Sequence, residues 1–189
     1  MTLPEHLTDL AERRIDGDWV YRGVLLHVRR DRVRLSTGVE AVREYIDHPG
    51  AAAIIPLFDD GSVLMERQHR YPLGRELYEL PAGKIDPGEE PLATARRELL
   101  EETGWVAATW RPLGTIHPVA AYCNERIEMF LARGLSHQGV PPDIHEPMEV
   151  FRLPVSTGLD WVREGRITDS KTMIGLFWAD KILRGDWPG

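Results

Sequence analysis

The stretch AGKIDPGEEPLATARRELLEETGW, from Ala82 to Trp105, decides how the chain is organised. Pro91 suits the first turn of a helix, where its missing N–H costs nothing, and Gly104 suits a C-terminal stop. We therefore expect a helix from Pro91 to Thr103. Apolar residues recur along it at the period of a helix and give it a face for packing: Leu92, Ala95 and Leu99.

Three glutamates lie close together on this expected helix. Glu98, Glu101 and Glu102 are related as i, i+3 and i+4, so their side chains share one face. The like charges repel one another, but a hard divalent cation such as Mg²⁺, which prefers carboxylate oxygens, makes such a cluster favourable. Arg97 precedes Glu101 by four residues and is placed to hold one carboxylate by a charge-assisted hydrogen bond. The ordinary alternative is a solvated charged face.

The surrounding spacing favours the metal. Gly83 is followed after five residues by Glu89, and after seven more by Arg97-Glu98-Leu99-x-Glu101-Glu102-x-Gly104-Trp105. This pattern resembles the Nudix box, G-x5-E-x7-R-E-U-x-E-E-x-G-U, with Trp105 bulkier than the usual aliphatic last residue. The resemblance implies an α/β (α+β) fold of mixed β-sheets sandwiched by helices. It also implies a hydrolase that cleaves nucleoside diphosphates linked to another moiety, with Mg²⁺ or Mn²⁺ as cofactor.

Carried over position by position, the resemblance assigns roles to residues of the box. The metal ligands are Glu98, Glu101, Glu102 and the carbonyl of Ala82. Glu89 is expected near the metal shell, and Arg97 is expected to orient a carboxylate. A bound metal would neutralise the pyrophosphate and lower the pKa of a bound water until that water attacks phosphorus.

Other stretches resemble the ADP-ribose pyrophosphatase branch of the family: YRG at 21–23, VRE at 42–44, HPGA at 48–51, ERQHRY at 66–71, ELPAG at 79–83 and GRITDSKT at 165–172. In this branch an N-terminal strand subdomain swaps onto a partner, and the sites of a homodimer use residues of both chains. We therefore divide the chain into an N-terminal antiparallel strand subdomain, 1–47, and a hydrolase domain, 48–189.

The same resemblance proposes residues that bind the substrate. Arg43, contributed across the dimer, and Arg70 would contact the phosphates or the terminal ribose, since an acidic protein needs fixed guanidinium donors to seat a dianion. Glu79 is a candidate for a ribose hydroxyl, and Glu76 is nearly as well placed. Glu125 is expected on the metal or phosphate side. The aromatic ring of Tyr122 is suited either to stacking on a base or to packing.

The branch takes its general base from a mobile acidic loop, which corresponds here to PPDIHEPMEVFRL at 141–153. Glu146 is our candidate, with Asp143 and Glu149 as alternatives. A carboxylate there would deprotonate the bound water once the substrate is seated. Because a Nudix enzyme can also take its base from the box helix, that alternative stays open.

Alternation and turn residues predict the remaining elements. Trp19 to Asp47 is typical of two or three antiparallel strands. Ala51 to Phe58 and Ser62 to His69 predict a hairpin around Asp59-Asp60-Gly61. Further expected elements are strands at Val106 to Ile116 and Arg126 to Ala132, a loop at Ser136 to Pro147, and helices at Ser156 to Glu164 and Ser170 to Leu183, with Thr168 or Asp169 as the N-cap of the last helix.

Composition excludes several function classes. The net charge of −7 and pI near 5.5 argue against a nucleic-acid or anionic-membrane binder. The longest apolar stretch, Ala51 to Phe58, is far shorter than the roughly 20 residues of a membrane span. Cys123 is the only cysteine, which fits a reducing cytoplasm, and no signal sequence is apparent in the first 19 residues. We expect a soluble cytoplasmic protein.

The sequence therefore predicts a homodimeric Nudix hydrolase that converts ADP-ribose to AMP and ribose 5-phosphate. GDP-mannose or another nucleoside diphosphate sugar is the alternative substrate. A non-catalytic sensor that binds ADP-ribose is the alternative of another class, although such a sensor would not need all three glutamates.

Overall fold

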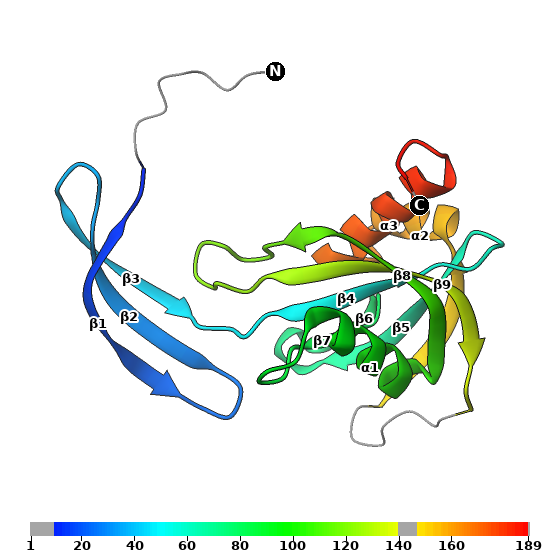
Figure 1. Ribbon diagram of the computed structural model, residues 1–189, viewed down its shortest axis with the longest axis horizontal. Helices are drawn as coiled ribbons and strands as arrows, with labels where there is room; N and C mark the ends of the chain where they lie inside the picture. Colours follow the sequence, from blue (N-terminus) through cyan, green and yellow to red (C-terminus); the bar gives the residue numbers. More distant parts are fainter. Residues whose placement is uncertain (1–9, 140–146, 189) are drawn as a thin grey trace. The chain divides into compact units, whose positions relative to one another are not determined.

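The computed structural model describes residues 10–139 and 147–188, and its backbone is drawn in Figure 1. Internal contacts divide the chain into two compact units. The first comprises the chain up to His48 together with Val119–Glu125, and the second comprises Pro49–Pro118 with the chain from Arg126 onward.

The first unit is built on an antiparallel sheet in the order β1 (Arg13–Arg22), β2 (His27–Arg34) and β3 (Glu40–Ile46). Alternation predicted strands in this part of the chain, and the first of them begins before Trp19. Among the residues of these three strands, only Asp31 and Val33 are buried. The Asp31 carboxylate lies 3.1 Å from Arg14 Nε and 3.2 Å from Arg29 Nη2.

The second unit contains a four-stranded sheet in the order β7-β4-β9-β8. Its central strand β4 (Ala51–Pro56) runs parallel to β9 (Ile127–His137) and antiparallel to β7 (Ala82–Lys84), and β8 (Trp105–Ile116) is an edge strand. Every residue of β4 is buried, as expected of a strand covered on both faces.

Helices cover the two faces of this sheet. Ala52 and Ile54 of β4 pack in one cluster with residues of helix α1 (Pro91–Thr103), whereas Ala53 and Ile55 pack in another with residues of α3 (Ser170–Leu183). Because successive strand residues point to opposite faces, α1 and α3 lie on opposite sides of the sheet (Figure 1). The predicted class, mixed sheets sandwiched by helices, is confirmed.

A second sheet has the order β10-β5-β6, formed by β10 (Met148–Pro154), β5 (Ser62–Arg70) and β6 (Arg75–Glu79). The predicted hairpin of Ala51–Phe58 with Ser62–His69 is therefore wrong in its pairing. The turn exists, since Phe58 N donates to Ser62 O at 2.8 Å, but beyond one bridge β4 and β5 enter different sheets. Strand β4 is buried on both faces and pairs with β9, while β5 pairs with β10 and β6.

Local signals placed the boundaries of α1 and α3 as observed, and those of the predicted helix at Ser156 to Glu164 one residue too late. Helix α1 has a proline in its first turn and ends at Gly104, whose φ of 73° lies in the left-handed region that glycine favours. Helix α2 spans Val155–Arg163. Asp169 is the N-cap of α3 and accepts a hydrogen bond from Thr172 N at 2.9 Å. A short 3-10 helix, Tyr71–Leu73, joins β5 to β6.

Strand β9 extends to His137, so it continues into the segment predicted as a loop from Ser136. Glu146 and Asp143, the first candidates for the general base, lie outside the described residues. None of the described helices has the length and apolar character that crossing a membrane requires.

Candidate active site

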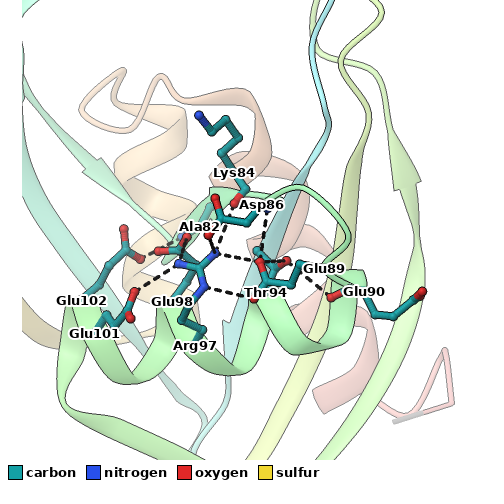
Figure 2. Close-up of polar contacts among 10 residues, drawn as sticks. All are labelled: Ala82, Lys84, Asp86, Glu89, Glu90, Thr94, Arg97, Glu98, Glu101 and Glu102. Carbon is teal, nitrogen blue, oxygen red and sulfur yellow. Dashed lines mark hydrogen bonds and ion pairs between the residues drawn. The ribbon is translucent and has the colours of Figure 1, made fainter. Parts of the chain in front are cut away.

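The Arg97 guanidinium is the centre of the site, as Figure 2 shows. Its Nε and Nη2 donate to the two carboxylate oxygens of Glu89 at 3.1 and 2.9 Å, which is a bidentate pair. Its Nη1 donates to Glu98 at 2.7 Å and to Glu101 at 3.1 Å, and Nη2 also reaches Lys84 O at 3.3 Å. One side chain therefore joins the loop before α1, strand β7 and the acidic face of α1.

Glu89 is fixed from the other side by the helix that follows it. Thr94 Oγ1 donates to Glu89 Oε2 at 2.7 Å, and Asp86 N donates to the same oxygen at 3.3 Å. Hydrogen bonds from Arg97 and Thr94 lower the pKa of Glu89 to about 2, and the bonds to Glu89 and Glu101 raise the pKa of Arg97. Both groups are charged at neutral pH, so the contact persists as an ion pair.

The three box glutamates share a face of α1 but differ in exposure. The side chain of Glu101 is 56% exposed, that of Glu98 is 13% exposed, and Glu102 is buried. Ala82 N donates to Glu102 Oε2 at 3.1 Å, so the backbone of β7 lies beside this carboxylate. The glutamate face of α1 is therefore solvated at Glu101 and buried at Glu102.

The position after Ala82 has no room for a side chain, and Gly83 occupies it. A Cβ at this position would lie 1.9 Å from the carboxyl carbon of Glu98, which is far inside van der Waals contact. The φ angle of Gly83 is not in the left-handed region. The constraint is therefore close approach: only glycine lets the Glu98 carboxylate lie against the backbone of β7.

A fourth glutamate lies behind the cluster. Glu66, on β5, is fully buried, and among the described residues neither carboxylate oxygen has a hydrogen-bond partner. Burial raises the pKa of Glu66 to about 8, although Lys171 acts in the opposite direction, and the Glu102 carboxylate lies against it. A buried carboxyl group of this kind needs a proton or a cation nearby.

The chemistry of these donors fits a hard divalent cation, which prefers carboxylate and carbonyl oxygens. The fit concerns the donors rather than a preformed cage, because within residues 10–139 and 147–188 no three His, Cys, Asp or Glu side chains converge on one point. Glu98 and Glu101 each bind Arg97 instead. A cation ligated by these carboxylates would compete with Arg97 for them, and it would also provide a positive charge near Glu102 and Glu66.

Arg70, a predicted substrate residue, is held by Glu79. Its Nε and Nη2 donate to the two carboxylate oxygens of Glu79 at 2.6 and 2.9 Å. Glu79 is 2% exposed and also accepts from Lys171 Nζ. Although burial acts in the other direction, hydrogen bonds from Arg70 and Lys171 hold the pKa of Glu79 below its ordinary value. Both oxygens of Glu79 are thus engaged inside the protein, whereas Glu76 is exposed and pairs with Arg67 at 3.3 Å.

Four other candidates make contacts that do not involve the box residues. Arg43 and Glu125 belong to the first unit, where Arg43 Nε donates to Glu12 at 2.9 Å and Glu125 lies 3.8 Å from His48 Nε2. Tyr122, in the same unit, is exposed. Glu149, at the start of β10, is exposed and lies 3.4 Å from Arg67. None of these contacts joins the residues to the Arg97 cluster.

A family model described as the NUDIX domain matches residues 47–164, which is more than half of the chain. The chain belongs to the Nudix family. This match confirms the prediction made from the box, and the matched segment contains all of the box residues. The match ends before α3, so Asp169 and Lys171 lie outside the matched segment.

Relatives within the Nudix family extend over nearly the whole chain. The chain is 34% identical over 174 residues to the ADP-ribose pyrophosphatase of Mycobacterium tuberculosis (strain ATCC 25618 / H37Rv), covering 90% of this chain and 84% of that protein. It is 33% identical over 172 residues to the ADP-ribose pyrophosphatase of Bacillus subtilis (strain 168), covering 90% and 93%. A solved structure titled as an ADP compounds hydrolase superposes with a TM-score of 0.81 at 22% identity, covering 95% of this chain and 98% of that one, and supports the fold.

Two features of the site escaped the sequence analysis. The sequence analysis predicted no role for Glu66, although this glutamate directly follows the apolar run Val63-Leu64-Met65 in the same strand. It likewise predicted no role for Lys171. Its contact with Glu79 spans 92 residues of sequence, which no local pattern predicts.

Proposed function

We propose that this protein hydrolyses the pyrophosphate bond of ADP-ribose to give AMP and ribose 5-phosphate. The observation that carries the proposal is the gathering of the box residues around Arg97, in a chain with two relatives of 33 to 34% identity over 90% of its length that are named ADP-ribose pyrophosphatases. The net charge of −7 requires that positive groups at the site overcome the field of the protein before a dianionic substrate can bind.

In this proposal Mg²⁺, or Mn²⁺, is held by Glu98, Glu101, Glu102 and the carbonyl of Ala82. The cation neutralises the diphosphate and lowers the pKa of a bound water. The chain's own part is positional. Arg97 holds Glu89 and the exposed edge of the acidic face, while the closeness of β7 at Gly83 fixes the Glu98 carboxylate.

Substrate contacts are assigned to Arg70 and, from a partner chain, to Arg43. The Arg70 side chain is 42% exposed, and its Nη1 makes no hydrogen bond to the described residues, so it remains available to a phosphate oxygen. Glu79 is given the role of holding Arg70 rather than of binding ribose, because both of its oxygens are bound and its side chain is buried. Glu125 keeps its proposed place on the phosphate side.

Glu146 is proposed as the general base. The proposal rests on its place in the acidic stretch of sequence that precedes β10, with Glu149 as the described alternative. A carboxylate within hydrogen-bond reach of the attacking water can accept its proton.

A homodimer is proposed with the same division, residues 1–47 dimerising and residues 48–189 forming the hydrolase domain. What supports it is the first unit taken by itself: its sheet buries few side chains, and apolar side chains on the strands and their connections are exposed, namely Val20, Tyr21, Val24, Leu25, Leu26, Val39 and Val42. Such side chains on a sheet with little core favour burial against another surface. Light scattering after size exclusion tests this directly, and a fully active monomer would refute it.

The substrate is tested by product analysis. The protein is incubated with Mg²⁺ and, separately, with ADP-ribose, GDP-mannose, NADH, diadenosine polyphosphates and dNTPs, and the products are separated by ion-exchange chromatography. Fastest turnover of ADP-ribose with AMP as product supports the proposal. Fastest turnover of GDP-mannose would keep the Nudix chemistry and replace the substrate. Tight binding of ADP-ribose without turnover of any compound would favour the sensor.

A further inference from the structure

Lys171 is a buried cation in the first turn of α3. Only 8% of it is exposed, and its Nζ donates to Glu79 and, at 3.0 Å, to Asp169. Lysine is rarely buried unless it is paired. The residue lies beyond the segment that matches the Nudix family, so the family match gives it no role.

The first turn of α3 is capped by a side chain and is also bound to the residue after β6. Asp169 caps the helix by accepting from Thr172 N at 2.9 Å. Thr172 Oγ1 in turn accepts from Leu80 N at 2.8 Å, next to Glu79. The backbone that carries Lys171 is thus held beside Glu79 by contacts other than the salt bridge.

The charge on Lys171 answers a specific electrostatic problem. Glu66 and Glu79 are paired across β5 and β6, and both are buried. Glu79 is the charged member of this pair, since it accepts hydrogen bonds from both Arg70 and Lys171, and a buried charge is costly unless it is paired. Two cations act on this carboxylate pair, Arg70 and Lys171. If Lys171 were removed, Arg70 would be left, of these two cations, to interact with both carboxylates.

That arrangement matters for the direction of Arg70. Glu79 binds the Nε and Nη2 edge of the guanidinium, which leaves Nη1 without a hydrogen bond to the described residues. A bidentate pair fixes the plane of the guanidinium as well as its place. If Glu79 turned toward or away from Glu66, the plane of Arg70 would turn with it.

We propose that Lys171 is a positioning residue for substrate binding: by holding Glu79, it sets the orientation in which Arg70 meets the diphosphate of the substrate. The inference rests on the proposed function for the identity of that substrate. Lys171 itself touches neither the substrate nor the reacting atoms.

The test compares Lys171→Met and Lys171→Arg with Lys181→Met, a change of the same type on an exposed position of α3 that pairs with Asp186 at 2.9 Å. Removing one charged hydrogen bond that orients a binding group predicts a KM for ADP-ribose raised about tenfold in Lys171→Met, with kcat within about twofold. Lys171→Arg, which keeps the charge, should recover part of the loss, and Lys181→Met should match the wild type.

A double-mutant cycle separates positioning from general damage. If Lys171 acts through Arg70, Lys171→Met should have little further effect on KM in an Arg70→Ala background. Additive effects would overturn the proposal, as would an unchanged KM in folded Lys171→Met.

A second measurement does not depend on turnover. Nitrogen-15 NMR of the Arg70 Nε–H should show slow hydrogen exchange in the wild type and faster exchange in Lys171→Met. A wild-type Arg70 Nε–H that exchanges as fast as those of exposed arginines would refute the proposal even if Lys171→Met failed to fold. If the wild type did not hydrolyse ADP-ribose, the proposed function would fail, and this exchange comparison would still decide the role of Lys171.

Discussion

Replacing Gly83 with alanine tests how closely the backbone of β7 and the carboxylate of Glu98 must approach. The added Cβ would lie 1.9 Å from the Glu98 carboxyl carbon and one of its oxygens, whereas ordinary contact begins at 3.4 Å. The carboxylate must therefore move by about 1.5 Å, or β7 must shift away from α1. Since the φ angle of Gly83 is accessible to alanine, the perturbation acts on the glutamate rather than on backbone strain.

The size of this movement of the Glu98 carboxylate sets the expected loss of activity in Gly83→Ala. A misplacement of about 1 Å at a reacting centre costs on the order of 100-fold in rate. We expect kcat/KM of Gly83→Ala to fall by at least about 100-fold, with a higher Mg²⁺ concentration needed for half-maximal activity. The melting temperature should change little, because Glu98 is at the edge of the core and its side chain can rotate toward solvent.

Gly88→Ala is the matched control. Gly88 has a φ of 80°, and a Cβ there would meet nothing within 4 Å, so alanine introduces backbone strain without a collision. Stability should fall by about 1 kcal/mol while activity at a permissive temperature is retained. Steady-state kinetics over a range of Mg²⁺ concentrations and thermal unfolding of both variants give the comparison. Wild-type kinetics in folded Gly83→Ala would refute the reasoning about Glu98.

Three further changes test other parts of the site. Arg97→Lys keeps the charge but loses the planar fork that binds Glu89 through two nitrogens, so kcat/KM should fall about 10- to 100-fold, and wild-type kinetics would contradict this. For Glu66, burial raises the pKa from 4.5 to about 8, so the native state binds more protons than the unfolded state in that range and its stability falls as pH rises. The stability of Glu66→Gln relative to the wild type, measured by urea unfolding in EDTA, should therefore increase between these pH values, and a constant difference would contradict the buried-carboxyl account. Glu146→Gln should lower kcat at least about 100-fold with unchanged thermal unfolding, whereas normal turnover would leave the box helix as the source of the base.

The sequence predicted the ends of α1, the start of α3 and the shared face of the box glutamates, because residues close together in sequence determine each of them. Pro91 and Gly104 mark the two ends of α1, and Asp169 caps α3, because a helix boundary is decided within a few residues. The spacing of the box likewise places the glutamates on one face of a helix. The family assignment followed from the identity and spacing of those residues.

The hairpin prediction failed because strand partners are not chosen locally. The turn residues Asp59-Asp60-Gly61 are correct for a turn, and the chain does reverse there. The uninterrupted apolar run of β4, however, is typical of a central strand covered on both faces, and such a strand pairs with distant strands. The parallel partner β9 begins more than 70 residues later, beyond the reach of any window of sequence.

The site shows the same division between local and distant contacts. The contact of Arg97 with Glu101 follows from helix geometry, whereas its bidentate pair with Glu89 depends on how the preceding loop returns to the helix. The contact of Lys171 with Glu79 depends on the docking of α3 against β6. Glu66 is visible in the sequence as a charge that directly follows an apolar run, but the residues packed around it in the fold are not.

The most direct test of the account is the rate of AMP formation from ADP-ribose, measured for the wild type and for Glu102→Gln with Mg²⁺ and again with EDTA. The account predicts equal amounts of AMP and ribose 5-phosphate from the wild type, no product in EDTA, and a rate at least about 100-fold lower in a folded Glu102→Gln. Formation of AMP at the wild-type rate by Glu102→Gln, or in EDTA, would contradict the claim that the box glutamates hold a catalytic metal.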